Sequence, residues 1–349
     1  MRITNTYMTR NYLGNLNNAL ELYNKSGDRI NSGRKLSKMS DNVSDGTRAL
    51  SIRTQSYKNE QIQENVKKAG ETLTVAESNL MSIKDIIDNI HSKCVEALNG
   101  PKESAAEIFS IDFDSVKEQI IEFANCKYND SYVLGGTNNQ EPPFSVNQSG
   151  ELYFNGTKVS EIAKKDGLFM GQDGFGLEVA QSRSVYIDVG INMTVKDGKI
   201  DPRTAFNMSE NGLDALGYGT TTLKYTNAQG QEASFTAPNN AYELIGEMAE
   251  CLREPRDYEK LAVLNDHLKE TFDGLVNEIA DIGIRTNYLD RHSSRLEDEE
   301  DVLTKIQNDL EYIKETDELI NNKNMEYSWL LTLQFGSKVL PQTLMDYIK

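Results

Sequence analysis

The feature that most constrains this fold is a long apolar repeat in the first third of the chain. Between Ile62 and Cys94, apolar residues recur at alternating spacings of four and three positions. Such a heptad stripe is typical of helices that pack side by side along their length. It predicts a helix from Ser51 to Leu98, about 70 Å long at about 1.5 Å per residue. The stripe consists of Ile62, Val66, Ala69, Leu73, Ala76, Leu80, Ile83, Ile87, Ile90 and Cys94.

Two more repeats predict helices on either side of the middle of the chain. A shorter helix carries Phe113 and Ile120 and ends before Gly135 and Gly136. The later part of the chain has an apolar residue at every seventh position, and we interpret its acidic run, residues 297–301, as a solvated helix face. That repeat consists of Leu268, Leu275, Ile282, Leu289, Leu296, Leu303 and Leu310.

The middle of the chain, residues 138–238, has the pattern of short strands and turns. Asn155-Gly156 suits a two-residue hairpin turn, because both residues tolerate positive φ. Residues 185–195 alternate like a strand that leads into a turn at Asp197-Gly198, and a second hairpin is expected around residues 227–231. The fold class is therefore mainly α, a long coiled-coil-like helical bundle built from both chain ends with an inserted small β-rich domain.

Both chain ends carry apolar stripes for which the body offers no partner. The N-terminal stripe is interrupted by Gly14 and Gly27, each of which costs a helix about 1 kcal/mol. An isolated helix of this quality is marginal in water, so we expect the two ends to pair with each other and with neighbouring molecules. The expected assembly residues are Leu13, Leu16, Leu20, Tyr23, Ile30, Trp329, Leu333, Leu340, Leu344 and Ile348.

A polar segment from Ile30 to Arg53 separates the N-terminal stripe from the long helix. It is rich in Ser, Asp, Asn and Gly and contains no Pro. We interpret it as a hinge, with Ser40, Asp41 and Ser44 as candidate caps that accept hydrogen bonds from the free N–H groups of the next helix.

Composition narrows the function. The 349 residues carry a net charge of −17, which argues against binding to nucleic acid or to an anionic membrane surface. No apolar run approaches the about 20 residues that span a bilayer, and no Sec-type signal peptide is expected. By itself this predicts a cytoplasmic protein, unless a dedicated export apparatus recognises a different targeting signal. The three cysteines, Cys94, Cys126 and Cys251, have no metal-like spacing and are expected to be reduced thiols.

No pattern predicts chemistry, so we expect no enzyme activity, no metal and no cofactor. The three histidines are His91, His267 and His292, and none has a second His four residues on. The segment that starts at Asp41 resembles a calcium loop only briefly, because Val43 and Ile52 stand where ligands are required.

Four segments resemble the flagellin superfamily, and within it the hook-associated protein 3 family of hook–filament junction proteins most closely. These are residues 32–53, with Ser32-Gly33-Arg34-Lys35-Leu36, residues 132–144, with Leu134-Gly135-Gly136-Thr137, residues 282–289, and residues 340–348. Met39 and Val43 stand where the family usually has Pro. The residues that carry the motifs are Ser32, Gly33, Ser40, Asp41, Arg53, Gly135, Gly136, Arg285 and Asn287.

This resemblance implies a secreted structural subunit at the junction between hook and filament. The family is exported by the flagellar type III apparatus, and an export chaperone holds the C-terminal segment. Implied partners are copies of the chain in a ring, the hook-side junction protein and flagellin. The expected domains are an N-terminal assembly helix with hinge (1–45), a helical rod in two halves (46–137 and 239–310), the β-rich insert (138–238) and a C-terminal assembly helix (311–349).

Two other functions remain open at this point. Flagellin, the filament subunit, is the first alternative, although the ending of this chain lacks the flagellin pattern. The second is an intracellular coiled-coil scaffold, which requires termini that are stably folded alone. An enzyme is a distant third.

Overall fold

The structure is a computed structural model that describes residues 2–36, 38, 40, 42–99, 105–165, 168–171, 185–196, 198–226 and 231–339. The chain divides into two compact units. The terminal unit contains Met1–Glu60 and Leu296–Lys349, and the central unit contains Gln61–Arg295. Two long helices, α2 (Val43–Asn99) and α6 (Tyr258–Glu311), contribute to both units.

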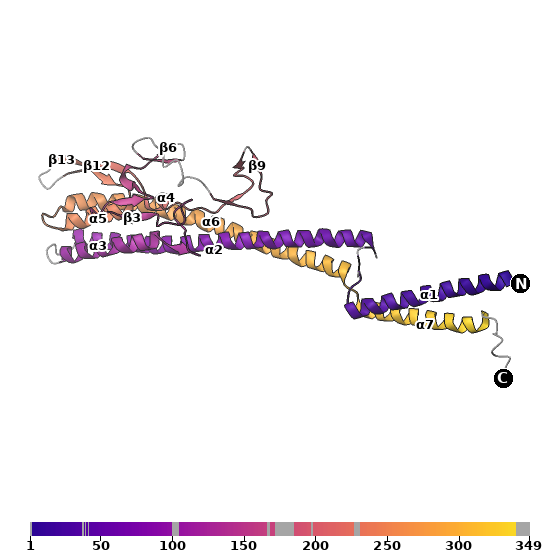
Figure 1. Ribbon diagram of the computed structural model, residues 1–349. Helices are drawn as coiled ribbons and strands as arrows, with labels where there is room; N and C mark the ends of the chain where they lie inside the picture. Colours follow the sequence, from indigo (N-terminus) through magenta and orange to yellow (C-terminus); the bar gives the residue numbers. More distant parts are fainter. Residues whose placement is uncertain are drawn as a thin grey trace. The chain divides into compact units, whose positions relative to one another are not determined.

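The terminal unit contains a pair of helices that bring the two chain ends together. Helix α1 (Arg2–Ser32) packs against α7 (Glu315–Val339), and the two run side by side in Figure 1, in indigo and yellow. The expected pairing of the ends is therefore observed. Helix α7 begins earlier than the apolar ending of the sequence suggests. Leu340, Leu344 and Ile348 lie outside the described residues.

Two short linkers connect this terminal helix pair to α2 and α6. Lys35 N–H donates to the carbonyl of Glu311 at 2.7 Å, and Ile313 N–H donates to the carbonyl of Gly33 at 3.1 Å. Arg34 and Tyr312 thereby form an antiparallel bridge. At the predicted hinge the chain therefore passes twice between the terminal helix pair and the long helices, and the two linkers are hydrogen-bonded to each other.

The capping prediction for α2 is wrong. The helix begins at Val43, so Ser44 lies inside it, and Ser40 stands in a turn before it. The amide oxygen of Asn42 accepts from the backbone N–H of Asp45 at 3.2 Å, which is the geometry of an N-cap. Asp41 lies outside the described residues.

The core of the central unit is the heptad stripe. Leu73, Leu80 and Ile83 on α2 and Leu268 and Leu275 on α6 are fully buried, as predicted. Burying one such side chain stabilises the fold by about 2 kcal/mol. Helices α3 (Ala105–Ala124) and α5 (Ala241–Leu252) pack on each other in the same unit. The repeat on α6 fades at its end, where Leu310 is only half-buried.

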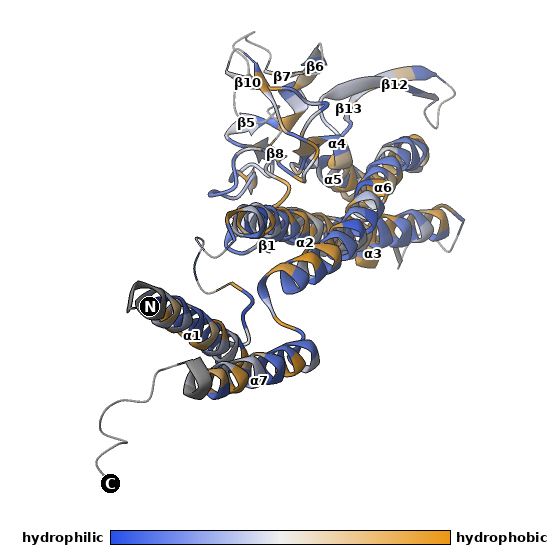
Figure 2. Ribbon diagram, turned by 90° about the vertical axis from the view of Figure 1, so that its right-hand side faces the viewer, coloured by the Kyte–Doolittle hydropathy of each residue, from blue (hydrophilic) through white to orange (hydrophobic). Residues whose placement is uncertain are grey.

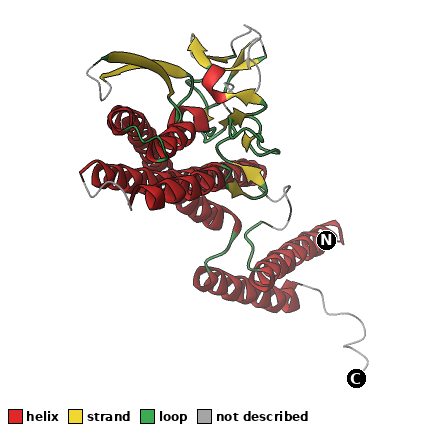
Figure 3. Cartoon of the chain, turned by 90° about the vertical axis from the view of Figure 1, so that its left-hand side faces the viewer, coloured by secondary structure: helices red, strands yellow, loops and turns green. Residues whose placement is uncertain are grey.

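The strands form small antiparallel sheets that gather together in the central unit, yellow in Figure 3. The turn predicted at Asn155-Gly156 is confirmed, with φ of 47° and 85°. The second hairpin is also present, with its loop outside the described residues. The elements are β1 (Lys127–Tyr128), β2 (Ser131–Tyr132), β3 (Phe144–Val146), β4 (Leu152–Phe154), β5 (Thr157–Lys158), η1 (Val159–Glu161), β6 (Ala163–Lys165), β7 (Leu168–Met170), β8 (Tyr186–Ile187), β9 (Val195–Lys196), β10 (Lys199–Ile200), β11 (Phe206–Asn207), α4 (Gly212–Leu216), β12 (Thr220–Thr226) and β13 (Glu232–Pro238).

The single strand predicted at residues 185–195 is only partly present: β8 stops at Ile187 and β9 starts at Val195, where the chain enters the predicted hairpin with β10, but the residues between them are not strand. The loop that follows β8 docks on the long helices instead. Asn65 of α2 donates to the carbonyl of Asp188 at 3.0 Å, and His292 of α6 hydrogen-bonds the carbonyl of Val189. Gly190 adopts φ of 85° and lies so close to Ile62 that an added Cβ would be 3.1 Å from it. Two helices therefore hold successive carbonyls of one loop.

Candidate assembly site

The terminal helix pair is held by one aromatic contact and a small polar cluster. Tyr23 of α1 stacks on Trp329 of α7, with ring centroids 6.0 Å apart and planes within 3°. Ser26 is buried, and its hydroxyl donates to Glu318 at 2.8 Å, while Arg29 lies 3.8 Å from the same carboxylate. These contacts fix how the two helices face each other.

The pair covers only part of the predicted assembly stripe. Leu16, Tyr23 and Ile30 are half-buried, as is Trp329. Leu13 and Leu20, by contrast, remain 47% and 37% exposed, and Leu333 is exposed on α7. The structure therefore brings the two predicted stripes together and leaves some of their members uncovered.

A second set of exposed apolar side chains lies on the same two helices, and sequence reasoning missed it. Figure 2 shows apolar residues, in orange, along both α1 and α7. The sequence feature that could have revealed this set is the presence of two adjacent apolar pairs, Leu319-Ile320 and Leu330-Leu331, most of which lie outside the predicted stripe. A gathering of exposed apolar side chains on two neighbouring helices is a candidate interaction site. The set consists of Tyr7, Met8, Leu22, Leu319, Ile320, Tyr327, Leu330, Leu331 and Phe335.

The end of α6 is joined to α2 by the predicted motif residue Arg53. Its guanidinium donates through two nitrogens to the Glu311 carboxylate, with Nε to Oε1 at 2.6 Å. Glu311 is buried, and the hydrogen bond from Arg53 lowers the pKa of its carboxyl group. Gly33, at φ of 68°, and the Ser32 hydroxyl, which accepts from Arg34 N–H at 3.3 Å, shape the chain on the other side.

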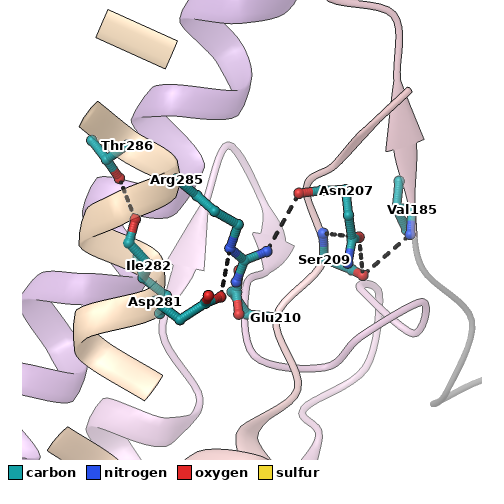
Figure 4. Close-up of polar contacts among 8 residues, drawn as sticks. All are labelled: Val185, Asn207, Ser209, Glu210, Asp281, Ile282, Arg285 and Thr286. Carbon is teal, nitrogen blue, oxygen red and sulfur yellow. Dashed lines mark hydrogen bonds and ion pairs between the residues drawn. The ribbon is translucent and has the colours of Figure 1, made fainter. Parts of the chain in front are cut away.

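Three further motif residues, Gly135, Gly136 and Arg285, lie around Glu210, a residue that the sequence did not single out. Gly136 N–H donates to the Glu210 carbonyl at 2.9 Å, and Gly135 forms a bridge with Asn211. Arg285 of α6 pairs with the Glu210 carboxylate (Figure 4). Glycine is required at position 135, because an added Cβ would be 2.0 Å from the carbonyl oxygen of Asn138. Two motifs far apart in sequence therefore hold one buried loop.

Arg285 also connects that loop to its own helix. Its Nη1 donates to the Asn207 carbonyl at 3.4 Å, and its Nε lies 2.9 Å from Asp281 (Figure 4). Burial raises the pKa of Glu210 to about 8, although Arg285 opposes the shift and Glu278 adds to it. Asn287 does not join this cluster; its amide donates to the Gly283 carbonyl one turn back.

Comparison with known proteins gives a family match for the first part of the chain. Residues 3–139 match the bacterial flagellin N-terminal helical region. No curated protein matches the sequence.

Solved structures extend the likeness to the fold of most of the chain. A structure from Vibrio parahaemolyticus assigned to the flagellar hook-associated proteins has a TM-score of 0.56 and 14% identity, and covers 78% of this chain and 100% of its own. Flagellar hook-associated protein 3 of Legionella pneumophila has a TM-score of 0.51 and 14% identity, and covers 74% and 98%. The predicted flagellin-like fold is thereby confirmed.

The segment that matches the family model contains nearly all of α1, the N-terminal linker, α2 and the Gly135-Gly136 motif. It therefore includes one partner of the Tyr23–Trp329, Arg53–Glu311 and Gly136–Glu210 contacts, while the contacts of Arg285 and Asn287 lie outside it. Among the described residues, no helix combines the length and the apolar character needed to cross a membrane.

Proposed function

We propose that this chain is a structural subunit of the junction between flagellar hook and filament, assembled through the terminal helix pair. The flagellin N-terminal helical region and the hook-associated fold support this proposal. The observation that carries it is the apolar surface of α1 and α7. Leu331 is 54% exposed and Phe335 is 61% exposed, although the two helices already contact each other.

That surface has a thermodynamic consequence. Burying apolar area stabilises a fold by about 25 cal/mol per Å². The exposed apolar side chains of α1 and α7 do not contribute this stabilisation in the single chain. Neighbouring subunits would cover the remainder, and the entropy lost in ordering the ends is offset only then. The proposed partners are copies of this chain in a ring, the hook-side junction protein and flagellin.

The proposal includes export in an unfolded form through the flagellar type III apparatus to the outside of the cell. An export chaperone would hold the C-terminal segment, including Leu340, Leu344 and Ile348, and would keep its apolar residues from associating early.

Removing the gene and imaging the cells tests the function. We expect hooks without filaments, with flagellin spilled into the medium. Filaments of ordinary length on the mutant cells would overturn the proposal. A purified protein that polymerises alone into long filaments would instead favour the flagellin alternative.

A pair of variants tests the surface itself. Leu331→Asp and Phe335→Asp should block incorporation into flagella while the melting temperature of the monomer changes little, because both side chains are already exposed. The matched control is Val195→Asp, an exposed apolar residue of the central unit. Full incorporation of the α7 variants, or their unfolding, would contradict the role of this surface.

A further inference from the structure

The hairpin of β12 and β13 is a sheet of two strands, so each strand has an edge without a strand beside it. The hairpin extends beside the smaller sheets of the central unit (Figure 2). Its strands pair from Thr220 with Pro238 to Thr226 with Glu232. Among the described residues, no other strand pairs with either of them. An open edge displays unpaired N–H and C=O groups and is a template for pairing with another chain.

The register shows which backbone groups of β12 point away from β13. Asn239 N–H donates to the Gly219 carbonyl at 3.0 Å, so this pair, which continues the register of the hairpin, is a hydrogen-bonded pair. Hydrogen-bonded and non-hydrogen-bonded pairs alternate along an antiparallel ladder. The N–H and C=O groups of every second residue of β12 therefore point to the open edge. These residues are Thr220, Thr222, Lys224 and Thr226, and all are exposed.

The two edges of the hairpin differ in how well they can accept another strand. On β13, the outward position opposite Thr220 is Pro238, which has no N–H to donate. Helix α5 also packs on β13. Strand β12 contains no proline and no acidic residue, although the whole chain has a net charge of −17, and its one charged residue is Lys224. Proline thus blocks strand addition at one edge and not at the other.

We propose that the β12 edge of one copy pairs with β12 of a second copy, in antiparallel orientation and centred on Leu223. In this register Thr222 lies opposite Lys224 of the second copy. Thr220 lies opposite Thr226, so every outward residue belongs to a hydrogen-bonded pair. A centre at Lys224 would set two lysines directly opposite each other, which destabilises a sheet. A centre at Thr222 would place Thr226 beyond the end of the second strand.

The same register brings the Leu223 side chains of the two copies together. Leu223 is half-buried in the single chain and lies on the face of the hairpin that carries Phe235. At the centre of the contact it forms a non-hydrogen-bonded pair, in which side chains approach most closely. The two copies use the same surface, so the contact closes after two molecules. It involves no residue of α1 or α7 and does not rest on the proposed function.

Proline substitution tests the edge by sedimentation equilibrium of the full-length chain. The background is Leu331→Asp/Phe335→Asp, which removes the apolar surface proposed for assembly, and this chain should form dimers. Thr222→Pro removes an N–H that points to the open edge and leaves the bonds to β13 in place. Association should therefore weaken at least about tenfold. Ser234→Pro is the matched control, because its N–H points from the other edge, and it should associate as the background chain does.

Cysteine cross-linking tests the register in the same background. Two Leu223→Cys residues would face each other with Cα atoms about 4.5 Å apart, which suits a disulfide, and oxidation should give a covalent dimer that dithiothreitol separates. Thr226→Cys is the control. It lies opposite Thr220 and is therefore about 20 Å from its counterpart, at about 3.4 Å per residue, so it should stay uncrosslinked. The background chain, with its natural cysteines, gives the baseline.

Three results would overturn the proposal. They are a background chain that stays monomeric at about 1 mM protein, a concentration at which even weak contacts form, equal association of Thr222→Pro and Ser234→Pro, and cross-linking of Thr226→Cys as strong as that of Leu223→Cys. Circular dichroism of each variant checks that it is folded. The gene-removal experiment addresses the junction role separately, so a failed contact leaves that role standing.

Discussion

At the scale of single residues, Glu210 connects the most distant motifs of the chain. Its backbone carbonyl is held by Gly136 and its carboxylate by Arg285, yet it lies almost wholly out of water. Burial of an ionised carboxylate is costly, and here the cost exceeds the attraction of one guanidinium, because Glu278 and Asp281 are also near. The result is a pKa near 8 for Glu210.

This pKa predicts that stability depends on pH. The folded state holds a proton on Glu210 between its ordinary pKa of 4.5 and its raised pKa of about 8, and the unfolded state does not. The free energy of unfolding should therefore fall as pH rises through that window, by a few kcal/mol in total. Urea unfolding of the wild type and of Glu210→Gln checks this, and the variant should lose most of the slope.

The matched control is Glu64→Gln, an exposed carboxylate on α2, which should leave the slope as it is in the wild type. An unchanged slope in Glu210→Gln would show that other groups cause the pH dependence, and Glu278, whose pKa burial also raises, would be the next candidate.

The sequence could not have led to Glu210, because nothing in its neighbourhood marks a buried acid. Motif resemblance found Gly135, Gly136 and Arg285, but it did not show that they meet. The capping error has a similar cause. Ser40, Asp41 and Asn42 are all good caps, and only the starting point of α2 at Val43 decides between them.

At the scale of elements, α1 is weakened by its two glycines. Gly14 and Gly27 lie inside the helix, and an added Cβ at either position would meet nothing within 4 Å. Alanine should therefore stabilise the helix by about 0.5–1 kcal/mol per site, since it removes the entropic cost of glycine. Gly14→Ala/Gly27→Ala should raise the helical circular dichroism signal and the melting temperature of the terminal unit.

Gly33, directly after α1, provides the contrast. An added Cβ there would also meet open space, but the residue has φ of 68°, a conformation that alanine adopts only at a cost of about 1 kcal/mol. Gly33→Ala should therefore lower the stability of the same unit. A gain from this substitution would mean that the turn relaxes to negative φ.

The pairing of α1 with α7 has a built-in reporter, because Trp329 is the only tryptophan of the chain. Tyr23→Ala removes the ring that stacks on it and should shift the Trp329 emission to longer wavelength as water replaces the ring. Amide exchange in α7 should rise while that of Leu73 to Ile90 stays slow. Tyr7→Ala, which removes an exposed ring from the same helix, is the control and should leave the emission unchanged.

Among the elements, the helices and the tight hairpins were predictable from sequence, and the irregular loops were not. Heptad spacing fixes which face of a helix is buried, and Asn155-Gly156 has the backbone freedom that its turn needs. Residues 185–195 alternate like a strand, but the carbonyls of Asp188 and Val189 are bound by Asn65 and His292, which are side chains of two helices. A local pattern cannot show a partner that is more than a hundred residues away.

At the scale of the whole molecule, the two units differ in how much of their apolar surface is covered. The central unit has a continuous core, whereas the terminal unit leaves apolar residues of α1 and α7 in water. Local stability follows such differences, so calorimetry should resolve two transitions. Leu80→Ala should lower the midpoint temperature of the upper transition, because truncating a fully buried leucine costs about 3 kcal/mol of unfolding free energy. Trp329→Ala should lower only the midpoint temperature of the lower transition. A single transition shifted by both variants would show that the units unfold together.

The double crossing between the terminal helix pair and the long helices has a mechanical consequence. A pull along the terminal helices reaches α2 through residues 33–42 and α6 through residues 312–314 at the same moment, so the tension divides between two covalent strands. The hydrogen bonds of Lys35 and Ile313, with the Arg53–Glu311 pair beside them, keep the strands in register as they stretch. Two linkers that are hydrogen-bonded to each other resist twisting of the terminal helices better than a single linker would.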